Sequence, residues 1–88
     1  MLNPAQTQDA IRQILVTHGR MANAASLEAG ADLYASGLTS FSAVQLMLAL
    51  EETFDVEFPE RMLNRRSFAS IDAIAGCLSD ITGQRVAA

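Results

Sequence analysis

The fold is constrained most by an uninterrupted run of helix-forming residues at positions 41–54, which contains neither glycine nor proline. Its central part, residues 46–52, reads Leu-Met-Leu-Ala-Leu-Glu-Glu, and these residue types have high intrinsic helix propensity. Helix breakers flank the run, because Gly37 precedes it and Pro59 follows it. We therefore expect one long helix here, and we expect the rest of the chain to pack against its apolar residues.

Two further amphipathic helices are predicted, one on either side of this run. Thr7 together with Asp9 gives the first a capped start, and Gly19 gives it a stop. Ser70 is a good N-cap for the last helix, which is expected to end near Gly83. The apolar residues of the first helix recur at helical spacing as Ala10, Ile11, Ile14 and Leu15. Those of the last helix recur as Ile71, Ile74, Leu78 and Ile81.

These patterns predict an all-α fold, a four-helix bundle with three longer helices and one short third helix. Pro59 can occupy the first turn of that short helix, which covers roughly residues 60–64. A long loop joins the first two helices, with room for a short helical turn. The apolar residues expected to hold this loop against the core are Leu27, Leu33, Tyr34 and Leu38. Residues 1–88 form a single predicted domain, with residues 1–6 and 84–88 flexible.

Composition excludes several classes of function. The chain has 88 residues, half of them hydrophobic, so it can bury one small core but cannot enclose a deep catalytic cleft. A formal net charge of −4 argues against a nucleic-acid partner and favours basic protein partners. The sequence shows no signal peptide and no long apolar span, so we expect a cytoplasmic protein that does not enter a membrane.

Nothing in the residue pattern indicates an enzyme. All six basic residues are arginine, so the chain has no lysine nucleophile. Paired metal-ligand spacings are absent, and no metal site is predicted. The single cysteine, Cys77, falls among core-type residues and is interpreted as a buried structural thiol. The single histidine, His18, is placed in the last turn of the first helix, where a cation favours the helix dipole.

Ser40 is the most informative position, because it stands directly ahead of the long helix. A phosphate ester on its hydroxyl would lie beside unpaired backbone N–H groups and the positive end of the helix dipole. No base is near it in sequence, so another enzyme would have to modify it. The alternative is that Ser40 is only the N-cap of the helix. Ser36 and Ser42 are the competing attachment sites, and we rank both far below Ser40.

A helical wheel divides the apolar residues of the long helix into two groups. The core group is Ala43, Leu46, Met47, Leu50 and Phe54. The second group is Phe41, Val44 and Leu48, which share their arc with Gln45, Glu51 and Glu52. A surface that mixes large apolar and acidic side chains suits transient docking of a partner. The alternative is that these apolar residues are scattered on the surface or covered by the long loop.

The sequence also resembles the acyl carrier protein family. The resemblance rests on residues 31–41, Ala-Asp-Leu-Tyr-Ala-Ser-Gly-Leu-Thr-Ser-Phe, residues 50–59, Leu-Glu-Glu-Thr-Phe-Asp-Val-Glu-Phe-Pro, and residues 68–71, Phe-Ala-Ser-Ile. It implies that Ser40 receives 4′-phosphopantetheine from coenzyme A by the action of a phosphopantetheinyl transferase. It also implies that the arm holds cargo as a thioester for partner enzymes, while the protein itself catalyses nothing. By the same resemblance, Phe41, Val44 and Leu48 with Glu51 and Glu52 form the recognition face.

Two departures from fatty-acid carriers point to a subtype. Thr39 stands where those carriers usually have aspartate, which predicts a different competent transferase, and Arg61, Arg65 and Arg66 replace a typically acidic region. Residues 37–41 and 63–68 look more like stand-alone aminoacyl carrier proteins, which are loaded by ligases similar to seryl-tRNA synthetases. The arginines are then candidate ligase contacts.

This subtype implies an amino acid such as glycine or alanine as cargo, a downstream acyltransferase and a monomeric carrier. Three alternatives stay open. The first is an acyl carrier in a specialised fatty-acid, polyketide or peptide pathway. The second is a carrier domain excised from a synthetase. The third is a noncovalent helical interaction module in which Ser40 is only a cap.

Overall fold

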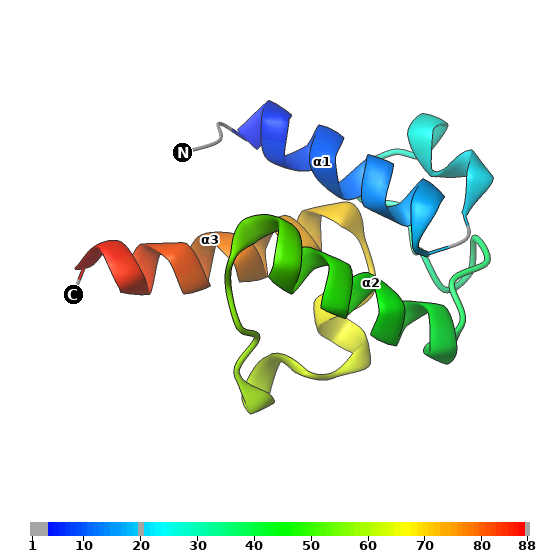
Figure 1. Ribbon diagram of the computed structural model, residues 1–88. Helices are drawn as coiled ribbons and strands as arrows, with labels where there is room; N and C mark the ends of the chain where they lie inside the picture. The colour runs from blue at the N-terminus through cyan, green and yellow to red at the C-terminus, as the bar shows by residue number, and fades with distance from the viewer. Residues whose placement is uncertain (1–3, 20, 88) are drawn as a thin grey trace.

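The structure is a computed structural model that describes residues 4–19 and 21–87, with side chains for residues 5–19 and 21–82. Three α helices form its frame, namely α1 (Pro4–Thr17), α2 (Ser40–Phe54) and α3 (Ile71–Ala87). Three short 3-10 helices lie between them, η1 (Ala22–Ser26), η2 (Glu60–Met62) and η3 (Arg65–Phe68). All regular structure among the described residues is helical, which confirms the predicted all-α class (Figure 1).

The long central helix agrees with its prediction to within one residue, because α2 begins at Ser40 and ends at Phe54. Both outer helices are longer than expected. α1 begins at Pro4, whose fixed φ suits a first helical turn, and α3 continues through Gly83 because one glycine costs a helix only about 1 kcal/mol. The predicted cap of α3 is present, since Ser70 Oγ accepts a hydrogen bond from Ala73 N at 3.0 Å.

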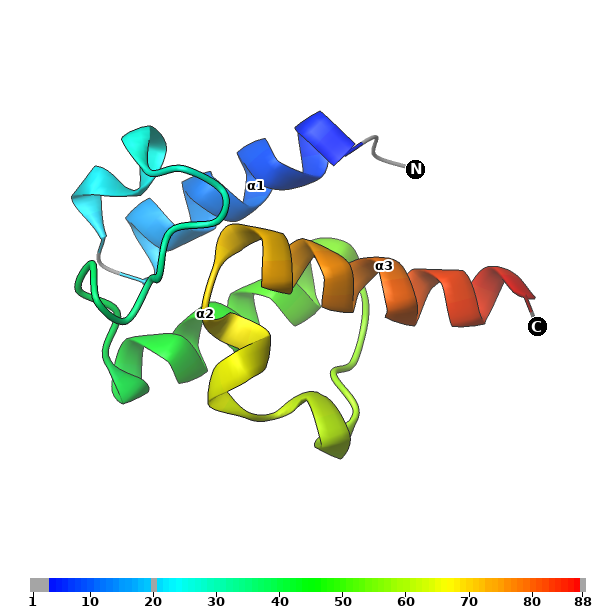
Figure 2. The ribbon, with the colours of Figure 1, turned by 180° about the vertical axis from the view of Figure 1, so that it is seen from behind.

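The helices α1 and α3 extend into the two chain ends that we predicted to be flexible. Residues 4–6 and 84–87 belong to helices, whereas residues 1–3 and 88 lie outside the described residues. In Figures 1 and 2 the start of α1 and the end of α3 point to the same end of the molecule. The start of α2 lies at the opposite end.

The segment predicted as one short third helix forms two 3-10 helices instead. Asn64 separates the two 3-10 helices, because its side chain forms hydrogen bonds with backbone atoms of both the preceding and the following segment. Asn64 Nδ2 donates to Arg61 O at 2.9 Å, which closes η2, and Asn64 Oδ1 accepts from Ser67 N at 3.0 Å, which caps η3. Local side-chain hydrogen bonds of this kind compete with a continuous helix.

The connection between α1 and α2 is attached to the rest of the fold at several points. Leu33 and Leu38 are buried, and Leu33 N donates to Ala69 O at 2.7 Å, just before α3. Arg12 of α1 reaches the same connection, because its Nη2 donates to Leu27 O at 3.0 Å. The connection therefore forms part of the core wall, although η1 is the only helix among its described residues.

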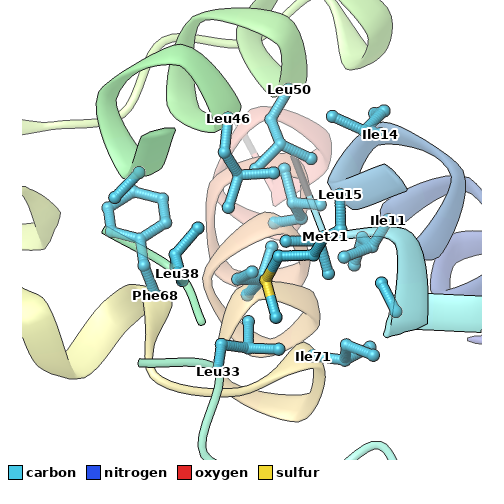
Figure 3. Close-up of a cluster of buried hydrophobic side chains, with 14 of the residues drawn as sticks. Ile11, Ile14, Leu15, Met21, Leu33, Leu38, Leu46, Leu50, Phe68 and Ile71 are labelled. Carbon is cyan, nitrogen blue, oxygen red and sulfur yellow. The ribbon is translucent and has the colours of Figure 1, made fainter. Parts of the chain in front are cut away.

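The core lies where the three α helices and this connection meet. Figure 3 shows Ile11, Ile14 and Leu15 of α1 facing Leu46 and Leu50 of α2. The largest side chains with essentially no exposed surface are Ile11, Leu15, Leu33, Leu46, Leu50, Ile71 and Ile74. Within the described residues, no helix is long and apolar enough to span a bilayer.

Replacing Leu33 by alanine tests whether the connection is held by burial. We expect Leu33→Ala to lower the free energy of unfolding by about 2–5 kcal/mol, because the side chain is fully buried. Leu48→Ala is the matched control and should change it by less than about 0.5 kcal/mol, since that leucine is 55% exposed. Urea denaturation followed by circular dichroism measures both, and equal losses would contradict the structure.

Candidate functional site

The start of α2 is held by reciprocal hydrogen bonds between Thr39 and Ser42. Thr39 Oγ1 accepts from Ser42 N at 3.0 Å, and Ser42 Oγ accepts from Thr39 N at 2.9 Å. Thr39 is therefore the N-cap, in an extended conformation with φ −98° and ψ 165°. The alternative prediction that Ser40 is the cap is wrong, because its neighbour occupies that role.

Ser40 is consequently the first residue inside the helix, and it is exposed. No hydrogen bond engages its hydroxyl among the residues that the structure describes. In an α helix the first N–H groups have no partner within the helix, so an anion on this hydroxyl would meet free donors and the positive end of the dipole. The position thus combines an accessible oxygen with an environment that favours negative charge.

The two competing serines are both engaged elsewhere. Ser36 Oγ donates to Asp32 O at 2.9 Å, and Asp32 in turn accepts from Tyr34 N at 3.0 Å. Ser42 is only 4% exposed and forms half of the capping pair. A modification of Ser42 would remove hydrogen bonds that hold the helix start, whereas a modification of Ser40 would not.

An open groove of about 420 Å³ begins at Ser40. One wall comes from α2, and the other comes from the segment around η3, which approaches the start of α2 in Figure 2. Its surface is mostly apolar. The lining residues are Tyr34, Ser40, Ala43, Val44, Met47, Leu63, Asn64, Arg65 and Phe68. We refer to it below as the Ser40 groove.

Arg65 and Tyr34 meet in the Ser40 groove. The guanidinium carbon of Arg65 lies 4.0 Å from the centroid of the Tyr34 ring, which is cation–π geometry. Burial raises the pKa of the Tyr34 phenol above 10.0, Arg65 opposes that rise, and Asp32 adds to it. Tyr34 is therefore a neutral hydrogen-bond donor at physiological pH.

The three apolar residues that we predicted to face solvent are exposed. Phe41 is 66% exposed, Val44 53% and Leu48 55%, so neither the long connection nor another helix covers them. We call these three residues the apolar ridge. A second groove of about 620 Å³ lies on its other side, lined by His18, Gln45, Leu48, Ala49, Glu52 and Thr53.

Sequence reasoning missed Leu63, which is 48% exposed and lines the Ser40 groove opposite α2. This leucine lies between η2 and η3, outside any helix, so helical periodicity gave no signal for it. Its only sequence signal was a large apolar residue next to the arginines at 65 and 66.

The two acidic residues assigned to the recognition face have different environments. Glu51 is half-buried, and its Oε2 accepts a hydrogen bond from Phe58 N at 2.9 Å, which ties the end of α2 to the following segment. Glu52 is exposed and lines the second groove. Glu51 thus has a structural role that its sequence position did not reveal, while Glu52 remains available on the surface.

The three arginines do not form one cluster with one role. All three are exposed, and only Arg65 packs over Tyr34. Arg61 and Arg66 have no ion-pair partner within the described part of the chain. The two residues interpreted as structural differ from their predictions. His18 follows the end of α1 and lines the second groove, and Cys77 is a free thiol that is half-buried, not buried, on α3. The described residues contain no group of three or more side chains that could hold a metal ion.

Comparison with known proteins agrees with this geometry. The family described as phosphopantetheine attachment site matches residues 9–83. An aminoacyl carrier protein of Agrobacterium fabrum is 57% identical over 65 residues, which cover 73% of this chain and 78% of that protein.

Two solved structures are also similar to this chain. The first is a crystal structure of an engineered Bradyrhizobium japonicum glycine:[carrier protein] ligase, complexed with carrier protein from Agrobacterium tumefaciens and ATP. It contains a chain 49% identical to this one, with a TM-score of 0.81, and the match covers 85% of this chain and 99% of that chain. A solution structure of a protein from Agrobacterium tumefaciens is 48% identical, with a TM-score of 0.72 and coverage of 92% and 99%.

The assignment of the cap can be tested by stability alone. Thr39→Ala should lower the free energy of unfolding by about 0.5–2 kcal/mol, because it removes the N-cap oxygen. Ser40→Ala should change it by less than about 0.5 kcal/mol, since this hydroxyl has no hydrogen bond among the described residues. Chemical denaturation of the two unmodified variants makes the comparison. If Ser40→Ala lowered the free energy of unfolding more than Thr39→Ala, Ser40 rather than Thr39 would be the N-cap.

Proposed function

The chain belongs to the phosphopantetheine attachment family, and on that premise we propose that it carries an aminoacyl group on a 4′-phosphopantetheine arm attached to Ser40. The observation that carries this proposal is that the hydrogen bonds that cap α2 do not involve Ser40. Thr39 and Ser42 hold the helix, so the exposed hydroxyl of Ser40 has no structural duty. It is the one nearby serine that can be esterified without loss of a hydrogen bond that the structure describes.

The residues around Ser40 fit this prosthetic group. When bound, the arm supplies a terminal thiol that can hold cargo as a thioester. The chain itself holds the phosphate ester at Ser40 Oγ, where the helix terminus favours its negative charge. The Ser40 groove borders the attachment point and leaves room for the start of the arm.

An amino acid is the cargo that the comparisons favour. The Agrobacterium fabrum relative is an aminoacyl carrier protein, and the related carrier of Agrobacterium tumefaciens was solved with a glycine:[carrier protein] ligase and ATP. At 49–57% identity, we infer that this chain is loaded by an amino acid:carrier protein ligase that uses ATP. A phosphopantetheinyl transferase would install the arm, and a downstream acyltransferase would receive the amino acid. We propose that the carrier works as a monomer in the cytoplasm.

The apolar ridge is the proposed contact surface for these enzymes. It starts one residue after Ser40, so a partner that reaches the arm also meets Phe41. Glu52 adds an exposed carboxylate next to Leu48 in the second groove. Arg61 in η2 and Arg66 in η3 are exposed and are further candidate ligase contacts. Thr39 adjoins the attachment point and is the proposed determinant of transferase choice. The contact surface is thus apolar at its centre with charges around it, as in many transient interfaces.

Modification of Ser40 can be measured directly. The unmodified protein is incubated with coenzyme A, magnesium and a broad-specificity phosphopantetheinyl transferase, and its intact mass is then determined. We expect one phosphopantetheine on the wild type and none on Ser40→Ala, because Ser40 is the only one of the serines at 36, 40 and 42 that is exposed with a hydroxyl free of described hydrogen bonds. Ser36→Ala is the matched control and should be modified like the wild type.

Two outcomes of this experiment would contradict the proposal. Absence of modification with several transferases would favour a noncovalent interaction module. Modification of a folded Ser40→Ala variant would move the attachment site to another serine. Circular dichroism of the variant shows whether it is folded.

A pair of valine variants tests the apolar ridge. Val44→Asp should lower the rate at which a glycine:carrier protein ligase loads the phosphopantetheinylated protein by about tenfold or more, because binding would bury an unpaired carboxylate. Val16→Asp is the matched control, since Val16 is 40% exposed on α1 and lines neither groove. Mass spectrometry of the loaded protein measures both rates. Equal rates would remove the ridge from the ligase interface.

A further inference from the structure

The turn between η2 and η3 presents a leucine to solvent from a well-anchored stretch of chain. Leu63 is 48% exposed, whereas its neighbour Met62 and the nearby Phe68 are buried. The ring of Phe68 packs against that of Phe58, with 5.4 Å between the two centroids. The chain is therefore fixed to the core on both sides of Leu63, and the fold holds this leucine outward.

Local hydrogen bonds fix the turn itself. Leu63 N donates to Glu60 O at 3.0 Å, and Asn64 Nδ2 donates to Arg61 O at 2.9 Å. Asn64 Oδ1 accepts from Ser67 N at 3.0 Å and from Ser67 Oγ at 3.3 Å. A partner that binds here does not have to order the backbone first, which lowers the entropic cost of binding.

The same turn carries an unusual concentration of positive charge. Three of the chain's six basic residues lie at positions 61–66, and no acidic residue occurs at positions 61–71, although the net charge is −4. Arg65 is held over Tyr34, whereas Arg61 and Arg66 are exposed without an ion-pair partner in the described part of the chain. We call Arg61, Leu63 and Arg66 the elbow surface. In Figures 1 and 2 the segment that contains η2 lies at the edge of the molecule.

We infer that the elbow surface docks the loading ligase, with Leu63 seated in an apolar pocket of that enzyme and the two arginines facing carboxylates beside the pocket. This inference rests on the proposed loading of an amino acid by a ligase. It adds a second contact to the apolar ridge, because Val44 of the ridge and Leu63 line opposite walls of the Ser40 groove. The ligase then contacts the carrier on both sides of the groove.

The residue types of the elbow surface suit this kind of contact. Burial of the exposed part of Leu63 in an apolar pocket removes apolar surface from water, which favours binding. Arginine is enriched at protein interfaces, and its planar guanidinium can form two parallel hydrogen bonds with one carboxylate. Because Arg61 and Arg66 have no ion pair to break within the described chain, both are available to a partner.

The charge of the elbow surface also gives selectivity. An enzyme whose carrier-binding surface is basic would meet Arg61 and Arg66 as like charges, which disfavours binding. An acidic surface is attracted instead, and this attraction speeds the encounter. Glu52 has the opposite charge and lies on the other side of the ridge, in the second groove. The two charges therefore define one orientation for a partner that spans the ridge.

The kinetics of loading test the anchor. A glycine:carrier protein ligase loads the phosphopantetheinylated protein with ATP, and mass spectrometry follows loading at several carrier concentrations. Leu63→Ser should raise the KM for the carrier about tenfold or more and change kcat less than about twofold, because a contact remote from the thiol stabilises ground state and transition state alike. Val16→Ser is the matched control and should leave KM unchanged, since Val16 is 40% exposed on α1 and lines neither groove.

Binding without the arm isolates the protein surface. The Ser40→Ala protein lacks the attachment hydroxyl, so its dissociation constant for the ligase, measured by isothermal titration calorimetry, reports contacts of the protein alone. Adding Leu63→Ser to this variant should raise the dissociation constant about tenfold or more. Adding Val16→Ser should not change it.

A charge-matched pair of double variants tests the arginines. Arg61→Gln combined with Arg66→Gln should raise the KM about fivefold or more and weaken its dependence on salt, because the screened charge pairs are gone. Ala5→Glu combined with Gln13→Glu makes the net charge more negative by the same amount, at exposed positions on α1. This control should keep the KM and the salt dependence of the wild type. Circular dichroism shows that each variant is folded.

The outcomes separate this inference from the proposed function. Normal KM values in Leu63→Ser and in the arginine double variant would overturn docking at the elbow surface and leave the aminoacyl carrier standing. An equal rise in both double variants would assign the effect to net charge and overturn the role of the arginines. A fall in kcat without a rise in KM would place Leu63 in the transfer step and overturn its role as an anchor. Failure of the ligase to load the phosphopantetheinylated wild type would overturn the proposed loading and this inference together.

Discussion

The hydrogen bonds between Thr39 and Ser42 determine where α2 begins, and the geometry of the site depends on that position. If the helix began one residue later, Ser40 would be the cap, and its hydroxyl would face the first turn. Because Thr39 takes that role, Ser40 becomes the first helical residue and keeps its hydroxyl in solvent. Phe41 then starts the exposed apolar ridge, while Ala43 turns into the core. The capping pair thus leaves Ser40 exposed at the end of the helix, next to the apolar ridge.

Residues of the same type divide into structural and surface roles around α2. Glu51 binds a backbone N–H at the end of the helix, whereas its neighbour Glu52 faces solvent. Arg65 is held by an aromatic ring, whereas Arg66 is free to meet a partner. In each pair only the first residue has a contact that fixes its side chain. A loss of function in a Glu51 variant would therefore reflect the altered fold as much as a lost contact.

Much of the fold and part of the site could be predicted from sequence, because those features depend on local patterns. The limits of α2 follow from helix propensity between Gly37 and Pro59, and the exposure of Val44 and Leu48 follows from helical periodicity. Other features depend on contacts that no local pattern reports. The choice between Thr39 and Ser40 as cap required the backbone geometry. The Glu51 bond to Phe58, the Arg65 contact with Tyr34 and the position of Leu63 required the folded chain.

The anchoring of Leu33 to Ala69 also affects what an enzyme can recognise. This hydrogen bond brings Tyr34 next to the segment that contains Arg65 and Phe68, so the Ser40 groove is assembled from parts that are far apart in the sequence. A nascent or misfolded chain has the serine but not the groove. An enzyme that contacts both walls before it acts therefore modifies only chains that have completed folding.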